Sequence, residues 1–269
     1  MRTITKITTQ QKNKERYNIF TDEGSGEHYA FSVDEAVIIK FGLKKGMDLD
    51  DLLYTEICFE DDIRKSYNQA LHYLGRRMRS EAEIRQFLKE KDVDPPIIQE
   101  VILKLYQYKF IDDEQYALAF VRTQMNTTDK GPVLIRQELK DKGIKAALID
   151  KAIDQFPFAA QLETAQKLCR KLTSRKSRDS ERILKQKIEQ MLIRKGFDYT
   201  IISEAVSETA GMEKNDEMEA LRYQAQKLHR KYEGESGYDY ERKMKQALFR
   251  KGFSLEQIED YLNQMDDEG

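Results

Sequence analysis

Apolar positions spaced four residues apart mark four similar stretches of the chain, which start at Ile84, Ile135, Ile188 and Met244. In each stretch the first residue is followed four positions later by leucine, so both side chains lie on one face of an α-helix. The starts lie 51, 53 and 56 residues apart. A period of this size indicates an array of tandem supersecondary units.

A tight turn is predicted after each of these helices. Lysine stands in the last helical turn, where its charge suits the helix dipole, and glycine follows in three of the four copies. Glycine favours the left-handed backbone that ends many helices, because it has no Cβ atom. The first copy has Asp92 at this position instead. The three glycines are Gly143, Gly196 and Gly252.

A second helix is expected after every turn, since an N-capping residue follows in three copies and apolar positions then recur with the helical period. The second copy has Lys145 in place of a cap. The expected caps are Asp94, Asp198 and Ser254. The expected buried stripes are Ile98, Val101 and Ile102; Ile149, Ala152 and Ile153; Ile202, Ala205 and Val206; and Ile258, Tyr261 and Leu262.

The remaining pattern sets the domain organisation. Residues 3–9, 16–22 and 28–32 alternate apolar with polar side chains, as strands do, and residues 34–41 and 48–59 favour helices. From Asp62 the chain favours helix to its end, with a further helix before each helix–turn–helix. We expect a mainly α protein in which a small β-containing module precedes tandem three-helix repeats. The expected borders are 1–61, 62–108, 109–157, 158–212 and 213–269.

Composition fits an array of thin units better than one thick globule, because apolar residues make up 39% and charged residues 35% of the chain. No run of about 18 apolar residues exists, so no membrane span is expected. The start of the chain lacks the apolar segment of a signal peptide. Cys58 and Cys169 have no ligand or disulfide spacing. We therefore expect a cytoplasmic protein.

Charge is unevenly distributed, although the formal net charge is only −2. Basic residues recur at the same inter-helix place in each unit, where they could contact phosphates along one face of the array. The alternatives are solvated helix ends, or a stripe that meets the acids of a protein partner. The candidate binding residues are Arg76, Arg77 and Arg79 in the first unit, Arg122 and Lys130 in the second, Arg170, Lys171, Arg175, Lys176 and Arg178 in the third, and Arg230 and Lys231 in the fourth.

Candidate catalytic and metal-binding residues do not form a site. Asp112, Asp113 and Glu114 stand at a predicted helix start, where the helix dipole favours acids. The histidines at positions 28, 72 and 229 have no partner at ligand spacing. No nucleophile can be matched with a base. We expect no enzyme, no metal and no cofactor.

The element Lys-Phe-Ile-Asp-Asp-Glu-Gln-Tyr-Ala at 109–117 stands between the helix start Ser80-x-x-Glu83 and Gly131 with the repeat stretch 135–144. Together these motifs resemble the RecX family of bacterial RecA regulators, over residues 62–265. The resemblance implies tandem three-helix repeats that form an elongated curved array. It also implies a non-enzymatic modulator, mainly an inhibitor, that binds the groove of the RecA–single-stranded DNA filament and regulates recombination, DNA repair and SOS activity.

The partners expected from this resemblance are the RecA filament and single-stranded DNA, with double-stranded DNA as a second candidate. We expect the protein itself to be a monomer. Two other functions stay open: a general nucleic-acid-binding helical repeat protein, and a protein–protein adaptor. Phosphate binding falls steeply with salt, which separates both nucleic-acid functions from the adaptor. Binding to RecA-coated against naked DNA separates the first two.

Overall fold

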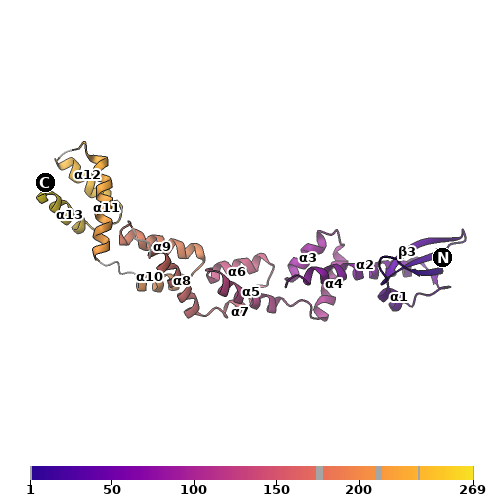
Figure 1. Cartoon of the computed structure of the whole chain (residues 1–269). Helices are drawn as coiled ribbons and strands as arrows, with labels where there is room; N and C mark the ends of the chain where they lie inside the picture. Colours follow the sequence, from indigo (N-terminus) through magenta and orange to yellow (C-terminus); the bar gives the residue numbers. More distant parts are fainter. Residues whose placement is uncertain (1, 174–177, 210–213, 236, 269) are drawn as a thin grey trace. The chain divides into compact units, whose positions relative to one another are not determined.

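The computed structural model describes residues 2–173, 178–209, 214–235 and 237–268 (Figure 1). It divides into two compact units, residues up to 117 together with 141–148, and residues 118–140 together with the chain from 149. Each contact discussed below lies within one of these units. Within the described ranges, none of the helices combines the length and the apolar content that crossing a membrane requires.

The N-terminal module is a four-stranded antiparallel sheet with strand order β3-β2-β1-β4. The alternation of apolar and polar residues predicted its three long strands, and β3 is a few residues longer than expected. The apolar face packs against α1 (Glu35–Phe41), around a core that includes Ile4, Ile19 and Val33. The strands are β1 (Arg2–Thr9), β2 (Arg16–Asp22), β3 (Glu27–Asp34) and β4 (Asp48–Leu49).

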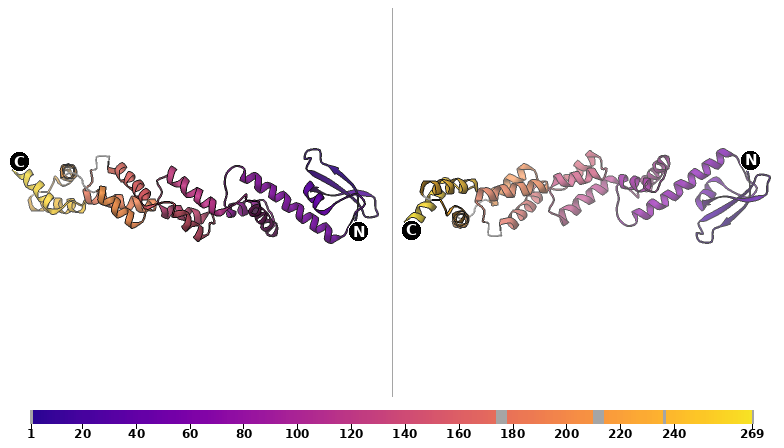
Figure 2. Two further views of the ribbon diagram at one scale, coloured as in Figure 1. Left: turned by 90° about the horizontal axis from the view of Figure 1, so that it is seen from below. Right: turned by 90° about the horizontal axis from the view of Figure 1, so that it is seen from above.

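Helix α2 (Asp51–Leu74) runs without a break from the sheet module into the helical part of the chain (Figure 2). The sequence suggested two helices here, one ending near residue 59 and the other starting near residue 63, and this prediction is wrong. Residues 59–63 include neither glycine nor proline, so the backbone has no reason to leave the helix. The border expected between residues 61 and 62 lies inside α2.

The rest of the chain is helical and falls into three-helix repeats: α2–α4, α5–α7, α8–α10 and α11–α13, here the first to the fourth repeat (Figure 1). The apolar pair that marks each copy is buried, with no side chain more than 3% exposed. The helices are α3 (Glu81–Lys89), α4 (Pro95–Gln107), α5 (Asp113–Thr127), α6 (Pro132–Asp141), α7 (Ala146–Ile153), α8 (Phe158–Thr173), α9 (Glu181–Lys195), α10 (Tyr199–Thr209), α11 (Lys214–Tyr232), α12 (Gly237–Arg250) and α13 (Leu255–Glu268).

The predicted left-handed turns are confirmed. Gly143, Gly196 and Gly252 have φ values of 74°, 82° and 93°, and Asp92 adopts the same conformation with φ 56°. Aspartate is one of the few other residues that tolerate this region. The structure thus keeps one backbone shape in all four turns, although the first lacks glycine.

The predicted cap Ser254 is confirmed, and Ser80 and Asp112 cap the helices that they were expected to start. Ser80 with Glu83 and Ser254 with Gln257 form reciprocal capping boxes, and the Asp112 carboxylate accepts hydrogen bonds at the start of α5. Asp94 precedes α4, but its side chain makes no capping hydrogen bond. Prolines occupy the next two positions and remove N–H groups that a cap would satisfy.

Candidate nucleic-acid interface

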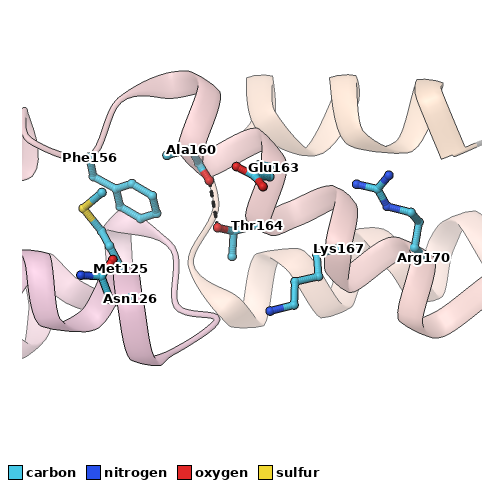
Figure 3. A pocket seen from close by; sticks show the side chains of 8 residues that line it. All are labelled: Met125, Asn126, Phe156, Ala160, Glu163, Thr164, Lys167 and Arg170. Atoms are coloured by element: carbon cyan, nitrogen blue, oxygen red, sulfur yellow. Dashed lines mark hydrogen bonds between the residues drawn. The ribbon is translucent and has the colours of Figure 1, made fainter.

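A cleft of about 500 Å³ lies beside α8 in the third repeat (Figure 3). One face of α8 lines it, because positions 160, 163, 164, 167 and 170 follow the helical period. The side chains of Met125 and Phe156 lie together at one end of the cleft, and those of Lys167 and Arg170 lie at the other. The cleft therefore combines an apolar end with two cations, and the exposed carboxylate of Glu163 also lines it.

The two cations of this cleft are available to a ligand. Lys167 has a side chain that is 76% exposed, and its nearest recorded acid is Asp129, at 3.9 Å. Arg170 is exposed, and among the described residues its guanidinium has no ion pair. Arg122 is exposed on α5, one helical turn before the cleft residue Met125. Lysine and arginine in such positions suit a phosphodiester.

The predicted cations of the first repeat have a different environment, because two of them gather around the Glu83 carboxylate. Arg77 donates to Glu83 at 2.7 Å, and Arg79 lies 3.9 Å from it. The Arg79 guanidinium also lies 4.0 Å from the ring centre of Tyr73. The Lys142 ammonium adds a third positive charge at 3.6 Å. Arg77 and Arg79 are thus engaged within the protein, whereas Arg76 is exposed.

The charge of Glu83 is stabilised by these neighbours. Burial alone would raise its pKa, but the hydrogen bonds from Arg77 and from the Ser80 N–H, together with the charge of Lys142, lower that pKa to about 2. The carboxylate stays ionised at any pH at which the protein is expected to work. The cluster therefore ties the loop after α2 to the start of α3.

The remaining candidates are scattered. The Arg178 guanidinium stacks 4.3 Å from the ring centre of Tyr223 and donates to its hydroxyl. Lys130 is paired with Glu138. Lys171 and Arg230 are exposed at helix ends, and Lys231 lies over the Tyr232 ring. Arg175 and Lys176 lie outside the described residues.

The structure thus brings together only part of the predicted set. Arg170 lies in the cleft, with Arg122 close by in sequence to one of its lining residues. Sequence reasoning missed Lys167, Asn126 and Thr164 as lining residues. The spacing of 167 and 170 on α8 could have indicated the lysine, but nothing in the sequence places Asn126 opposite them. That these residues bind nucleic acid stays a prediction.

The acids at the start of α5 have structural roles. Asp113 accepts a hydrogen bond from the Glu81 N–H at 2.9 Å, and burial raises the pKa of its carboxyl, with the nearby Glu81 charge adding to the shift. In the part of the chain that the structure describes, no group of histidine, cysteine and acidic side chains could hold a metal ion.

Comparison with known proteins identifies the family. The family model described as "Regulatory protein RecX N-terminal domain" matches residues 2–50. The models of the first and second RecX three-helix domains match residues 67–105 and 112–153. The third RecX three-helix domain matches twice, at 159–206 and 215–262. Two copies of one domain type agree with the sequence, since residues 165–172 and 225–232 are identical at six of eight positions.

Similar full-length proteins carry the same description. A regulatory protein RecX from Bacillus cytotoxicus is 42% identical over the whole of both chains, and one from Halalkalibacterium halodurans is 43% identical over 98% of this chain and all of its own. A crystal structure of regulatory protein RecX has 40% identity and a TM-score of 0.68, and covers 76% of this chain and 98% of its own. The chain therefore belongs to the RecX family of regulatory proteins.

Proposed function

We propose that this protein modulates the RecA recombinase, mainly as an inhibitor, by binding in the groove of the RecA–single-stranded DNA filament. In this way it regulates recombination, DNA repair and SOS activity, with no chemistry of its own. The observation that carries the proposal is the likeness to regulatory RecX proteins over the whole chain, sheet module and four repeats included. The protein acts in the cytoplasm as a monomer.

The contact with DNA runs through exposed cations, with Lys167 and Arg170 in the α8 cleft as the leading pair. A phosphate between two such side chains gains affinity that does not depend on base sequence. Arg122, Arg76 and Arg230 extend this set on other repeats. The repeats that carry them are expected at 62–108, 109–157, 158–212 and 213–269, after a module at 1–61, and the family domains match residues 2–50, 67–105, 112–153, 159–206 and 215–262.

The test is the single-stranded-DNA-dependent ATPase of the cognate RecA, measured while this protein is added. Inhibition below one molecule per RecA protomer is expected, because a protein that occupies the groove affects several protomers. No effect at an excess of protein would contradict the proposal. Retained binding to naked DNA in that case would favour a general nucleic-acid-binding protein, and its loss would favour an adaptor.

A paired set of variants tests the cleft. The double change Lys167→Ala with Arg170→Ala should weaken DNA binding and lower the slope of log affinity against log salt by about 0.7 for each lost phosphate contact. The control is Lys185→Ala with Lys187→Ala, which removes the same charge from α9, where both lysines are already paired with acids. Equal losses in both pairs would indicate a nonspecific effect of net charge.

A further inference from the structure

The start of α3 in the first repeat is capped by residues of the second repeat. Ser80, the N-cap of α3, donates its hydroxyl to the Lys142 carbonyl at 2.7 Å, across 62 positions of sequence. The adjacent Glu81 N–H donates to the Asp113 carboxylate at 2.9 Å. Ser80 is fully buried, so water does not compete for its hydroxyl.

The third and fourth repeats meet through the same pair of contacts. Ser180, the N-cap of α9, donates to the Lys251 carbonyl at 2.6 Å, across 71 positions. The Glu181 N–H donates to the Glu217 carboxylate at 2.8 Å. We call each contact between consecutive repeats a joint. In both of these joints a buried serine contacts the turn of the next repeat, and an acid from the first helix of that repeat accepts a hydrogen bond from the N–H of the residue after the serine.

The second and third repeats also meet at this turn, and the hydrogen bonds there join backbone groups. The Gly131 N–H donates to the Lys195 carbonyl at 2.7 Å, and the Val133 N–H donates to the Gly196 carbonyl at 3.0 Å. Here Gly131 and Pro132 stand where the other joints have serine and glutamate, so neither the hydroxyl nor the next N–H is available. At all three joints, therefore, the lysine–glycine turn of one repeat packs against the start of the middle helix of the repeat before it.

The turn glycines are needed for this close approach as well as for their backbone angles. A Cβ atom on Gly143 would lie 2.3 Å from the Ala82 Cβ, and one on Gly252 would lie 2.4 Å from the Ser180 hydroxyl. Asp92 is exposed in the turn of the first repeat, which has no three-helix repeat before it. The turn without glycine is thus the one that seats on no preceding repeat.

We propose that Ser80, Asp113, Ser180 and Glu217 are positioning residues, which fix the orientation of the second repeat on the first and of the fourth repeat on the third, so that several repeats engage one extended ligand together. This rests on the proposed function, since a filament is such a ligand. Hydrogen bonds are directional, so two of them at each joint define an angle as well as a contact. Simultaneous engagement raises affinity only where the geometry lets all contacts form at once.

The test compares Ser80→Ala with Ser180→Ala in one full-length chain against Ser254→Ala. Ser254 is a matched control, because it also caps a helix but, among the described residues, its side chain bonds to Gln257 of its own repeat and to no other residue. Three quantities are measured: helix content by circular dichroism, the maximum dimension by small-angle X-ray scattering, and affinity for short and long single-stranded DNA, naked and RecA-coated.

The double variant should keep its helix content and its affinity for a short oligonucleotide, show a broader distribution of dimensions, and lose about tenfold in affinity for long ligands. Ser254→Ala should change none of these. Equal losses for short and long ligands, or unchanged scattering and affinity, would overturn the proposal. If the unaltered chain bound long naked DNA but no RecA filament, the proposed function would fail, while the comparison of ligand lengths would still decide on the joints.

Discussion

Gly131 and Gly196 lie in direct backbone contact, 65 positions apart in sequence. A Cβ atom on Gly131 would lie 2.3 Å from the Gly196 carbonyl oxygen, well inside van der Waals contact. The Gly196 carbonyl cannot move aside as the end of a flexible side chain would, because it belongs to the backbone and accepts a hydrogen bond from the Val133 N–H. The joint between the second and third repeats therefore depends on the absence of one methyl group.

Gly131→Ala should lower the free energy of unfolding by about 1–3 kcal/mol, as overpacking against backbone does. Gly75→Ala is the matched control, since a Cβ there would meet no atom closer than 3.6 Å. That change should be neutral or should stabilise by up to about 1 kcal/mol. Urea unfolding of both variants checks the prediction, and equal stabilities would contradict it.

Exchanging the residue types of the first two turns should have opposite effects. Asp92→Gly relieves a left-handed non-glycine residue in an exposed turn and should stabilise the protein by about 0.5–1 kcal/mol. Gly143→Asp introduces both backbone strain and a contact with Ala82, and should destabilise it by about 2 kcal/mol or more. Thermal unfolding of the two variants measures both signs, and a shared sign would disprove the seating of the second turn.

The buried ion pair between the sheet and α2 gives a contrast between neighbours. Asp61 is 2% exposed and accepts two hydrogen bonds from Arg16 and one from the Asp34 N–H. Asp61→Asn leaves the Arg16 charge without its partner and should cost about 3 kcal/mol. Asp62→Asn alters an exposed pair with Lys65 and should cost less than about 1 kcal/mol. If chemical denaturation gave similar losses of unfolding free energy for both variants, the buried pair would contribute no more to stability than the exposed one.

The Glu83 cluster predicts a stability change in acid. The pKa of Glu83 is lowered to about 2 in the folded chain, so its ionised form stabilises the fold above the unfolded pKa, near 4.5. This contribution, at most about 3 kcal/mol, is lost as the pH falls from 4.5 towards 2. Burial raises the pKa of Asp113 and of Glu217, so these two groups act in the opposite direction.

The measurement is therefore a difference between variants at each pH. Glu83→Gln should be less stable than the unaltered chain at pH 7, and this difference should shrink as the pH approaches 3. Glu90→Gln, at an exposed position after α3, should differ by less than about 0.5 kcal/mol throughout. A Glu83→Gln difference that stays constant with pH would exclude the cluster as the cause.

Local features of the fold could be predicted from the sequence because their causes are local. The turn glycines, the Ser80 and Ser254 capping boxes and the buried apolar pairs each depend on residues within a few positions of one another. The continuity of α2 was missed, since acids at 60–62 suggest a helix start while the absence of a breaker allows a helix to continue.

The candidate site was less predictable because its contacts are distant in sequence. Glu83 is recognisable as part of a cap, but Lys142, which shares it with Arg77 and Arg79, comes 59 positions later. The same holds for Lys167 and Asn126, which line one cleft from different repeats. Ser80 was identified as a cap, and its second role, as a donor to the next repeat, needed the structure.

Helix α2 also has a mechanical consequence. It contributes Ile57 to the core of the sheet module and Ile63, Tyr67 and Ala70 to the core of the first repeat. Its 24 residues make a rod of about 36 Å at 1.5 Å per residue, with no hinge between the two cores. A force or torque applied to the sheet would thus be transmitted to the first repeat through this helix. Cutting the chain at residue 61 would remove a rigid connection and not a flexible linker.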